Sequence, residues 1–397
     1  MRCACTRWPS CLSSWCTSGE RARASPAKRA SLPLPRSPRC LRRASLSLRQ
    51  TLQAFFGPLH RSRECEGGLT TGNDISVIVP NYNGAALLPA CLEALAAQTL
   101  PAGEIIVVDD GSTDGSRDLV RTRFPQVRLV ALPDNGGFCR AANAGLRAAR
   151  GQLLALLNND AEAAPGWLAA LADALALHPE AGACASKMLF RDQPARLNSA
   201  GLFLRFDGMA RDIGYDQPDG PEFSAPAMVF GASGGAALYR RALLEDVGLF
   251  DEGLVAYSED VDLAFRAQWR GWRCLYVPSA VVYHRVGATY GRESAGAAYY
   301  RSRNTLIVLL KNMPARVLWR YWPAILAAQA YQVGYLATRG QGWAALHGKW
   351  DALRELRGVW ARRRETLGAR RVPERQVEAA LSPLGWRGRD PHALARG

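Results

Sequence analysis

Short apolar runs alternate with amphipathic stretches between residues 75 and 157, and this alternation is the strongest pattern in the chain. The apolar runs are rich in β-branched residues or leucine and end in polar residues or glycine, as buried strands do. The stretches between them repeat apolar residues at the three- and four-residue spacing of helices. The pattern predicts strands over 75–80, 104–109, 127–131 and 152–157, and helices over 86–98, from the turn at 110–116 to about 124, and over 138–150.

Four strands alternating with three helices indicate an α/β fold with a doubly wound, mainly parallel sheet flanked by helices. Right-handed crossovers bring the carboxyl ends of parallel strands to one edge of the sheet. Open sheets of this kind bind their ligands at that edge. We therefore expect the functional site where polar residues follow the predicted strands.

Beyond residue 190 the pattern is less regular. Gly, Pro and Asp are frequent from 190 to 235, which predicts irregular and partly antiparallel structure. The later pattern predicts helices over 240–247 and 261–270, strands over 273–277 and 280–283, a helical extension over 297–367 and a flexible basic tail over 368–397.

The net charge of +15 is concentrated at the two ends of the chain. Residues 1–72 carry +10 and residues 339–397 carry +7, which leaves −2 for residues 73–338. A near-neutral core with basic ends suits an anionic membrane surface better than nucleic acid, which usually binds a basic patch on the folded domain.

The leader over 1–72 mixes Arg, Ser, Pro and Cys without apolar periodicity, so we expect it to be disordered. The alternative is an over-extended reading frame whose true start lies near residue 72. The leader holds six of the ten cysteines, and the other four lack metal-ligand spacing. These four therefore indicate a reduced, cytoplasmic protein.

Acidic residues stand at three places where chemistry is expected. Asp109 and Asp110 end the second strand, Asp160 follows the fourth, and Glu259-Asp260 opens a helix. A strand-end carboxylate can accept hydrogen bonds from a nucleobase or complete a Mg²⁺ or Mn²⁺ shell beside a diphosphate. A carboxylate at a helix start can act as a general base toward a hydroxyl. Each of these residues could instead serve only as a turn former or helix cap.

Three other segments add weaker signals. Pro80-Asn81 ends the first strand, and Asn135 precedes a Gly-Gly pair that can approach a phosphate or form a plain turn. His284 follows a strand and is a candidate metal ligand, although a lone histidine is more often structural.

Taken in this order, these motifs resemble the family 2 glycosyltransferases over about residues 75–287. Within that family the likeness is to the rhamnosyltransferase-like group. It rests on NNDAE at 158–162, GASGGAALYRR at 231–241 and YSEDVDLAFRAQWRGWRCLYVPSAVVYHRVGAT at 257–289.

The resemblance implies a GT-A domain over 73–296 and inverting, metal-dependent sugar transfer. The donor would be a dTDP-, UDP- or GDP-linked sugar, with rhamnose as one candidate, and the metal Mg²⁺ or Mn²⁺. Asn158 replaces the first carboxylate of the family's Asp-x-Asp metal motif, which weakens the metal assignment. The implied roles are catalysis by the base Asp260 with Glu259, nucleotide-sugar binding by Pro80, Asn81, Asp109 or Asp110, Asn135, Gly234 and Gly235, and metal binding by Asp160 and His284.

The helical extension carries aromatic residues among basic ones. Residues 317–337 approach the length of a membrane span, but Arg320, Pro323 and two glutamines favour an interfacial helix. Trp343, Trp350 and Trp360 recur at helical spacing beside arginines, which is typical of a basic amphipathic helix on a membrane. The alternative is a helix packed on the catalytic domain. The first interpretation predicts a peripheral protein on the inner face of the cell membrane, with a lipid-linked or polysaccharide acceptor.

Two rival functions remain. A nucleotidyltransferase would also use nucleotide, metal and strand-end carboxylates, but residues 81–85 lack the basic side chain that it needs. A noncatalytic scaffold of the same fold would not need to keep Asp160 and the Glu259-Asp260 pair.

Overall fold

The computed structural model describes residues 72–285, 294–389 and 391. Apart from Gly72, the predicted leader lies outside these residues. Ten of the described strands form one sheet: β1 (Ile75–Asn81), β2 (Glu104–Asp110), β3 (Arg128–Leu132), β4 (Leu153–Leu157), β5 (Ala161–Ala163), β6 (Ala181–Phe190), β7 (Gln193–Ser199), β10 (Ala227–Val229), β11 (Ala236–Arg240) and β12 (Arg273–His284). A separate antiparallel pair is formed by β8 (Leu202–Leu204) and β9 (Ala210–Asp212).

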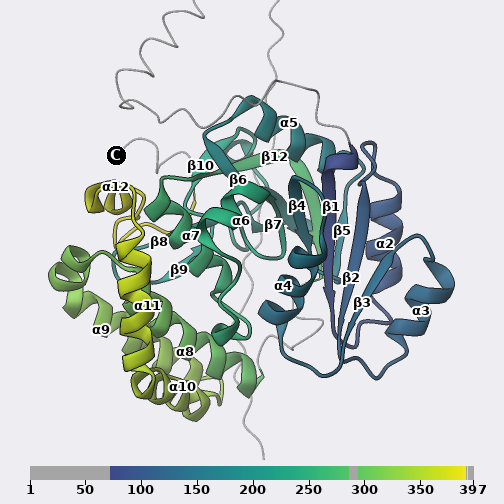
Figure 1. Ribbon diagram of the computed structural model, residues 1–397. Coiled ribbons are helices and arrows are strands. Elements are labelled where there is room, and N and C mark those ends of the chain that lie inside the picture. Colours follow the sequence, from purple (N-terminus) through teal and green to yellow (C-terminus); the bar gives the residue numbers. More distant parts are fainter. Residues whose placement is uncertain (1–71, 286–293, 390, 392–397) are drawn as a thin grey trace, which may run out of the picture. The chain divides into compact units, whose positions relative to one another are not determined.

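The helices lie on both faces and at one end of the sheet (Figure 1). The α-helices are α2 (Leu88–Ala96), α3 (Ser116–Arg123), α4 (Phe138–Ala148), α5 (Trp167–Leu177), α6 (Arg241–Val247), α7 (Glu259–Arg270), α8 (Ala295–Asn312), α9 (Ala315–Ala337), α10 (Gly342–Arg354), α11 (Leu356–Gly368) and α12 (Glu374–Ala379). Short 3-10 helices are η1 (Gly72–Asp74), η2 (Pro221–Phe223) and η3 (Glu252–Leu254).

The predicted parallel sheet is confirmed. Strands β4, β1, β2 and β3 are neighbours in that order, and all three pairings are parallel. Strand β11 runs antiparallel between β4 and β6 and so joins a second group of strands to the first. Eight strands follow the order β10-β12-β6-β11-β4-β1-β2-β3, while β5 pairs with β12 and β7 with β6 beside this path.

Side-chain alternation along β1 divides the core into two layers. Ile75, Val77 and Val79 face a cluster with α2, α3 and α5, whereas Ile78 faces a cluster with α4, α6, α7 and α8. All four side chains are fully buried. The strand is therefore apolar throughout, as expected of a parallel strand covered on both faces.

Several elements, among them α5, β5, β6 and β11, had no prediction, and one strand was divided wrongly. Nothing was predicted for the segment that forms α5 and β6, although β6 is a ten-residue strand beside β12. The two strands predicted over 273–277 and 280–283 are one strand, β12, with a register shift between Val277 and Val281. Pro278 lies at that irregularity, where the lack of an N–H is tolerated.

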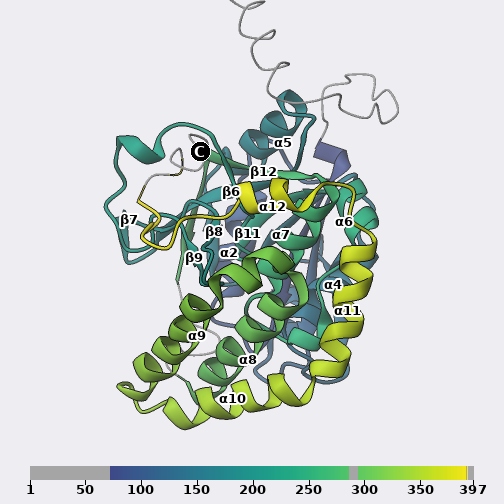
Figure 2. The same ribbon diagram turned by 90° about the vertical axis from the view of Figure 1, so that its left-hand side faces the viewer.

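The helical extension is confirmed as helical, since α8, α9, α10 and α11 follow one another from 295 to 368. Figure 2 shows α11 running back from α10 toward α12. No helix in the described part of the chain combines the length and apolar character that a bilayer crossing requires.

The expected flexible tail is wrong for residues 369–388, which pack on the domain. Val377 and Leu381 are buried, and Trp386 meets Phe203 edge to face at 4.5 Å. The Ser382 N–H donates to Leu204 O at 2.8 Å. The prediction rested on the Pro/Arg/Gly composition of this segment. Its few apolar residues, Val377, Leu381 and Trp386, are enough to hold it on the domain.

Candidate active site

A cleft lies at the carboxyl ends of β1, β2 and β4 and extends to the start of α7. Nine of the predicted site residues line it: Pro80, Asn81, Asp110, Asp160, Gly234, Gly235, Glu259, Asp260 and His284. Asp109 and Asn135 do not. The cleft is also lined by Tyr82, Phe138, Ala141, Asn158, Asn159, Ser233, Ala256, Tyr257 and Arg301.

Asp109 and Asp110 differ in position although they are adjacent. Asp109 is fully buried beneath the cleft, where its carboxylate accepts hydrogen bonds from Asn81 Nδ2 and the Ser112 N–H, both at 3.1 Å, and pairs with Arg117. Asp110 lines the cleft. Since neighbouring residues of a strand point to opposite faces, only one of the two can reach a ligand directly. The geometry favours Asp110 as the residue that contacts a ligand. Asp109 instead supports the cleft from beneath through its bonds to Asn81, Ser112 and Arg117.

The Gly136-Gly137 turn packs against Asp110 and forms hydrogen bonds with its carboxylate. Both glycine N–H groups donate to the Asp110 carboxylate, at 3.0 and 2.8 Å. Gly137 has φ of +89°, and a Cβ there would lie 2.5 Å from Val255 Cγ1. The position therefore requires glycine. Asn135 is exposed, and its Oδ1 accepts the Gly137 N–H at 3.0 Å, so it shapes this turn. Burial raises the pKa of Asp110 although the two N–H groups oppose the change.

Asp160 and His284 lie together at the ends of β4 and β12. His284 Nε2 is 3.0 Å from Asp160 Oδ1, and its Nδ1 is 2.8 Å from Asn198 Oδ1. With the proton on Nδ1, directed at the Asn198 amide oxygen, Nε2 beside Asp160 would be the nitrogen that offers a lone pair to a metal.

These two side chains fit a divalent cation only with help from a ligand. Among the described residues there is no group of three or more His, Cys, Asp or Glu side chains placed to hold a metal. Asp160 and His284 would provide one oxygen and one nitrogen, and diphosphate oxygens and water would complete the shell. Asn158 contributes no carboxylate. The donor set is therefore compatible with a cation that arrives with a nucleoside diphosphate.

Glu259 and Asp260 lie in the first turn of α7. Asp260 Oδ2 accepts the Gly234 N–H at 3.1 Å, and its Oδ1 accepts the Val261 N–H at 2.8 Å. Burial raises the pKa of Asp260. Burial and the neighbouring Asp260 charge raise the pKa of Glu259, which favours its protonated form. Glu259 Oε2 is buried and has no hydrogen-bond partner among the described residues.

The glycine pair Gly234-Gly235 lies between the acidic pair and the end of β4. Gly234 donates to Asp260, and the Gly235 carbonyl accepts the Asn158 N–H at 2.9 Å. Both glycines line the cleft between Asp260 and the Asp160–His284 pair, and a Cβ on Gly235 would lie only 2.9 Å from Met188 Cε. This position suits the reacting groups of a substrate.

The loop before α7 is held in an unusual backbone conformation. Val255, Tyr257 and Ser258 have φ between 65° and 69°, a region that non-glycine residues rarely occupy. Asn304 of α8 stabilises this loop, because its Nδ2 lies 2.7–2.9 Å from the carbonyl oxygens of Leu254, Ala256 and Tyr257. Strained backbone held in this way is common beside catalytic residues.

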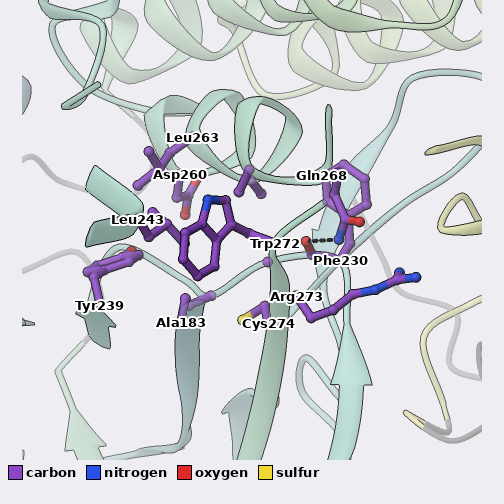
Figure 3. Close-up of a pocket in the computed structure, with 14 residues that line it drawn as sticks. Ala183, Phe230, Tyr239, Leu243, Asp260, Leu263, Gln268, Trp272, Arg273 and Cys274 are labelled. Carbon is purple, nitrogen blue, oxygen red and sulfur yellow. Dashed lines mark hydrogen bonds between the residues drawn. The ribbon is translucent and has the colours of Figure 1, made fainter. Parts of the chain in front are cut away.

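Asp260 also borders a small cavity on the inner side of α7 (Figure 3). Its lining is mostly apolar and includes Tyr239, Trp272 and Cys274. Gln268, which also lines it, donates to Phe230 O at 3.0 Å. The apolar lining explains why burial dominates the pKa of Asp260, since little water surrounds the carboxylate from that side.

Several residues that line the cleft were not predicted from the sequence. Asn159 could have been noticed because it lies in the same motif as Asp160, and its Nδ2 donates to Asn81 Oδ1 at 2.8 Å. Tyr257 likewise precedes the acidic pair. Arg301 had no such signal, because its helix folds back to the cleft only in the tertiary structure.

Comparison with known proteins agrees with this geometry. Residues 76–248 match the family described as Glycosyl transferase family 2. An N-acetylglucosaminyl-diphospho-decaprenol L-rhamnosyltransferase of Mycobacterium tuberculosis is 30% identical over 259 residues, covering 59% of this chain and 83% of that protein. The succinoglycan biosynthesis protein ExoO of Rhizobium meliloti is 32% identical over 218 residues, covering 53% and 60%.

A crystal structure of GalNAc-T7 with UDP, GalNAc and Mn²⁺ is similar in fold, with a TM-score of 0.50 and 17% identity over 72% of this chain and 58% of that one. The GT-A architecture expected from the sequence is thereby confirmed. Together with the cleft at the strand ends, these similarities show that the chain belongs to glycosyl transferase family 2 and is a glycosyltransferase of the rhamnosyltransferase-like type.

Proposed function

We propose that this glycosyltransferase moves a sugar, with rhamnose as the first candidate, from a nucleoside-diphosphate donor to a hydroxyl of a lipid-linked saccharide. The transfer would invert the anomeric centre in a single displacement. The observation that carries the proposal is the placement of Asp260 and of the Asp160–His284 pair in one cleft, separated by Gly234 and Gly235.

Each group has a distinct part in this proposal. Asp260 accepts the proton of the acceptor hydroxyl, and its raised pKa makes it a stronger base than an exposed aspartate. Asp160 and His284 would hold a divalent cation, which would supply positive charge to the departing diphosphate. Asp110, at the end of β2, faces the nucleotide.

The donor and cofactor classes are supported by the similar proteins. GalNAc-T7 was crystallised with UDP and Mn²⁺, and the mycobacterial relative is named for a diphospho-decaprenol acceptor. Both Mn²⁺ and Mg²⁺ suit a carboxylate, phosphate and water shell, and the imidazole of His284 favours Mn²⁺.

We also propose peripheral binding to an anionic membrane on the cytoplasmic side. Several large aromatic side chains of α9, α10 and α11 are exposed, namely Trp319, Trp322, Tyr331, Tyr335, Trp343, Trp350 and Trp360. Arginines accompany them, and Arg339 lies 4.7 Å over the Tyr335 ring. Aromatic and basic side chains on one helical layer suit a lipid headgroup region.

The test is nucleoside diphosphate release by the protein over a panel of dTDP-, UDP- and GDP-sugars, with Mn²⁺ or Mg²⁺ and membrane lipid extract. Asp260→Asn should lower turnover by at least about a hundredfold, the usual contribution of a general base, while donor affinity is retained.

Asp118→Asn is the matched control, because Asp118 is exposed on α3 and 82% of its side chain is accessible. It should leave turnover unchanged. Full turnover by Asp260→Asn would refute the assignment of the base. Retained anomeric configuration in the product would refute the single displacement.

A further inference from the structure

Arg301 is the one arginine or lysine among the described residues that line the cleft. The same cleft is lined by the carboxylates Asp110, Asp160, Glu259 and Asp260. Within the described part of the chain, Arg301 forms no ion pair with any of them or with another acid. Its guanidinium carbon lies 4.7 Å over the ring of Tyr257, another lining residue. Its charge is therefore available to an anionic ligand.

Helix α8 holds Arg301 in place through contacts on both sides. On the outer side, Tyr299 Oη donates to Asp351 at 2.8 Å and Arg303 pairs with Glu355, which join α8 to α10 and α11. On the inner side, Asn304 bonds the loop before α7. Arg301 and Asn304 are one turn apart and so share the inner face of the helix.

A buried polar cluster fixes the distance between α8 and the catalytic helix. Asp262 of α7 accepts hydrogen bonds from Lys311 Nζ at 3.1 Å and from Asn312 Nδ2 at 2.7 Å. Arg266, Lys311 and Asn312 together overcome the effect of burial and lower the pKa of Asp262 to about 2. Asp262 therefore stays ionised at neutral pH and keeps its bonds to α8, the helix that carries Arg301.

We propose that Arg301 binds a phosphate of the diphosphate that links the acceptor sugar to its lipid. This inference rests on the proposed function and names the acceptor group that the cleft recognises. The donor diphosphate already has the Asp160–His284 pair and its cation. Arg301 lies instead on the helix between the base and α10, whose Trp343 and Trp350 are exposed toward the proposed membrane.

This geometry orders the acceptor along one path. The lipid chain lies at the aromatic helices, its diphosphate meets the Arg301 guanidinium, and the sugar hydroxyl reaches Asp260. Guanidinium binds phosphate through paired, charge-assisted hydrogen bonds, so the contact adds affinity and fixes orientation.

The probe is farnesyl diphosphate, with farnesol as its phosphate-free counterpart, and binding to the whole protein is measured by calorimetry without added metal. Arg301→Gln should weaken farnesyl diphosphate binding by roughly tenfold and leave farnesol binding unchanged. Arg301→Lys should keep part of the affinity. Arg150→Gln, at the opposite end of the sheet, removes an exposed arginine and should bind as the wild type does.

Equal farnesyl diphosphate binding by the wild type and Arg301→Gln would overturn the proposal. A loss of UDP or dTDP affinity in Mn²⁺, without a loss of farnesyl diphosphate affinity, would also overturn it and assign Arg301 to the donor. The measurement needs no turnover. An inactive wild type that still binds the prenyl diphosphate through Arg301 would contradict the proposed function and support this inference.

Discussion

At the residue scale, the site depends on two adjacent acids in different surroundings. Asp260 borders the cleft and receives two backbone N–H groups, whereas Glu259 is buried and its Oε2 has no described partner. Burial is the first cause of the raised pKa at both residues. The two carboxylates differ because the Gly234 and Val261 N–H groups oppose the rise at Asp260, whereas the Asp260 charge adds to it at Glu259.

Glu259 makes the stability of the protein depend on pH in a direction opposite to that of most carboxylates. Its pKa in the folded state, about 8, lies above the ordinary value of 4.5. The folded state therefore binds the proton more tightly than the unfolded state, and stability falls as pH rises from 4.5 to 8.

The substitution Glu259→Gln should remove this loss of folding stability at high pH. We expect the free energy of unfolding of the variant to exceed that of the wild type by on the order of a few kcal/mol at pH 8.5, and the difference to vanish near pH 4. Urea unfolding of both proteins at the two pH values measures this difference in free energy of unfolding. A constant difference across the range would contradict a buried, neutral Glu259.

At the element scale, α8 supports the loop that precedes Glu259 and Asp260, the proposed catalytic pair. Three residues of that loop have positive φ, and Asn304 bonds three of its carbonyl oxygens. The helix beyond the sheet is thus part of the site, although it lies outside the matched family segment of 76–248. Without Asn304 we expect the loop to relax toward ordinary backbone angles.

Asn304→Ala should therefore lower kcat more than it raises the KM for the donor, because the loop leads directly into the proposed base Asp260 on α7 and not into the proposed nucleotide pocket. The lost hydrogen bonds should also destabilise the protein by about 1–3 kcal/mol. Steady-state kinetics and thermal unfolding measure the two effects.

Ser302→Ala is the control on the same helix. Ser302 Oγ is buried and has no hydrogen-bond partner among the described residues, so its removal should be nearly neutral. If both variants lose kcat equally, the loss reflects general damage to α8.

At the scale of the whole molecule, the exposed aromatic side chains of α9 and α10 form the surface that we propose binds the membrane. Trp319 and Trp343 each expose 83% of their surface, far more than a folded domain usually leaves to a tryptophan. Deleting residues 315–367 would not test this layer cleanly. That segment also provides Ala345, Val359 and Arg363, which are buried.

Replacing Trp319 and Trp343 together by serine is a sharper test. The double variant should bind vesicles of equal phosphatidylglycerol and phosphatidylcholine at least about tenfold more weakly, because apolar surface no longer enters the interface. Cosedimentation with the vesicles measures this binding. Leu177→Ser on α5, with 78% exposure in the wild type, is the control and should bind normally. Undiminished binding by the double variant would exclude these helices as the contact surface.

Much of the fold was predictable because its signals are local. Side-chain alternation and helical spacing predicted β1, β2, β3 and β4 with the helices between them, and parallel strands necessarily bring their polar ends together. The sequence failed where contacts are distant. The last segment was expected to be flexible, yet Trp386 packs on Phe203, 183 positions earlier in the chain.

The sequence alone determined the parallel part of the sheet, the edge at which its strands end and the acids that gather there. Only the tertiary structure decided that Asp110 rather than Asp109 faces the cleft, that burial raises the pKa of Glu259, and that Arg301 lines the cleft. The reason is physical. Strand order and side-chain periodicity arise from neighbours along the chain, whereas burial, pKa and access to a cleft depend on elements that meet only after folding.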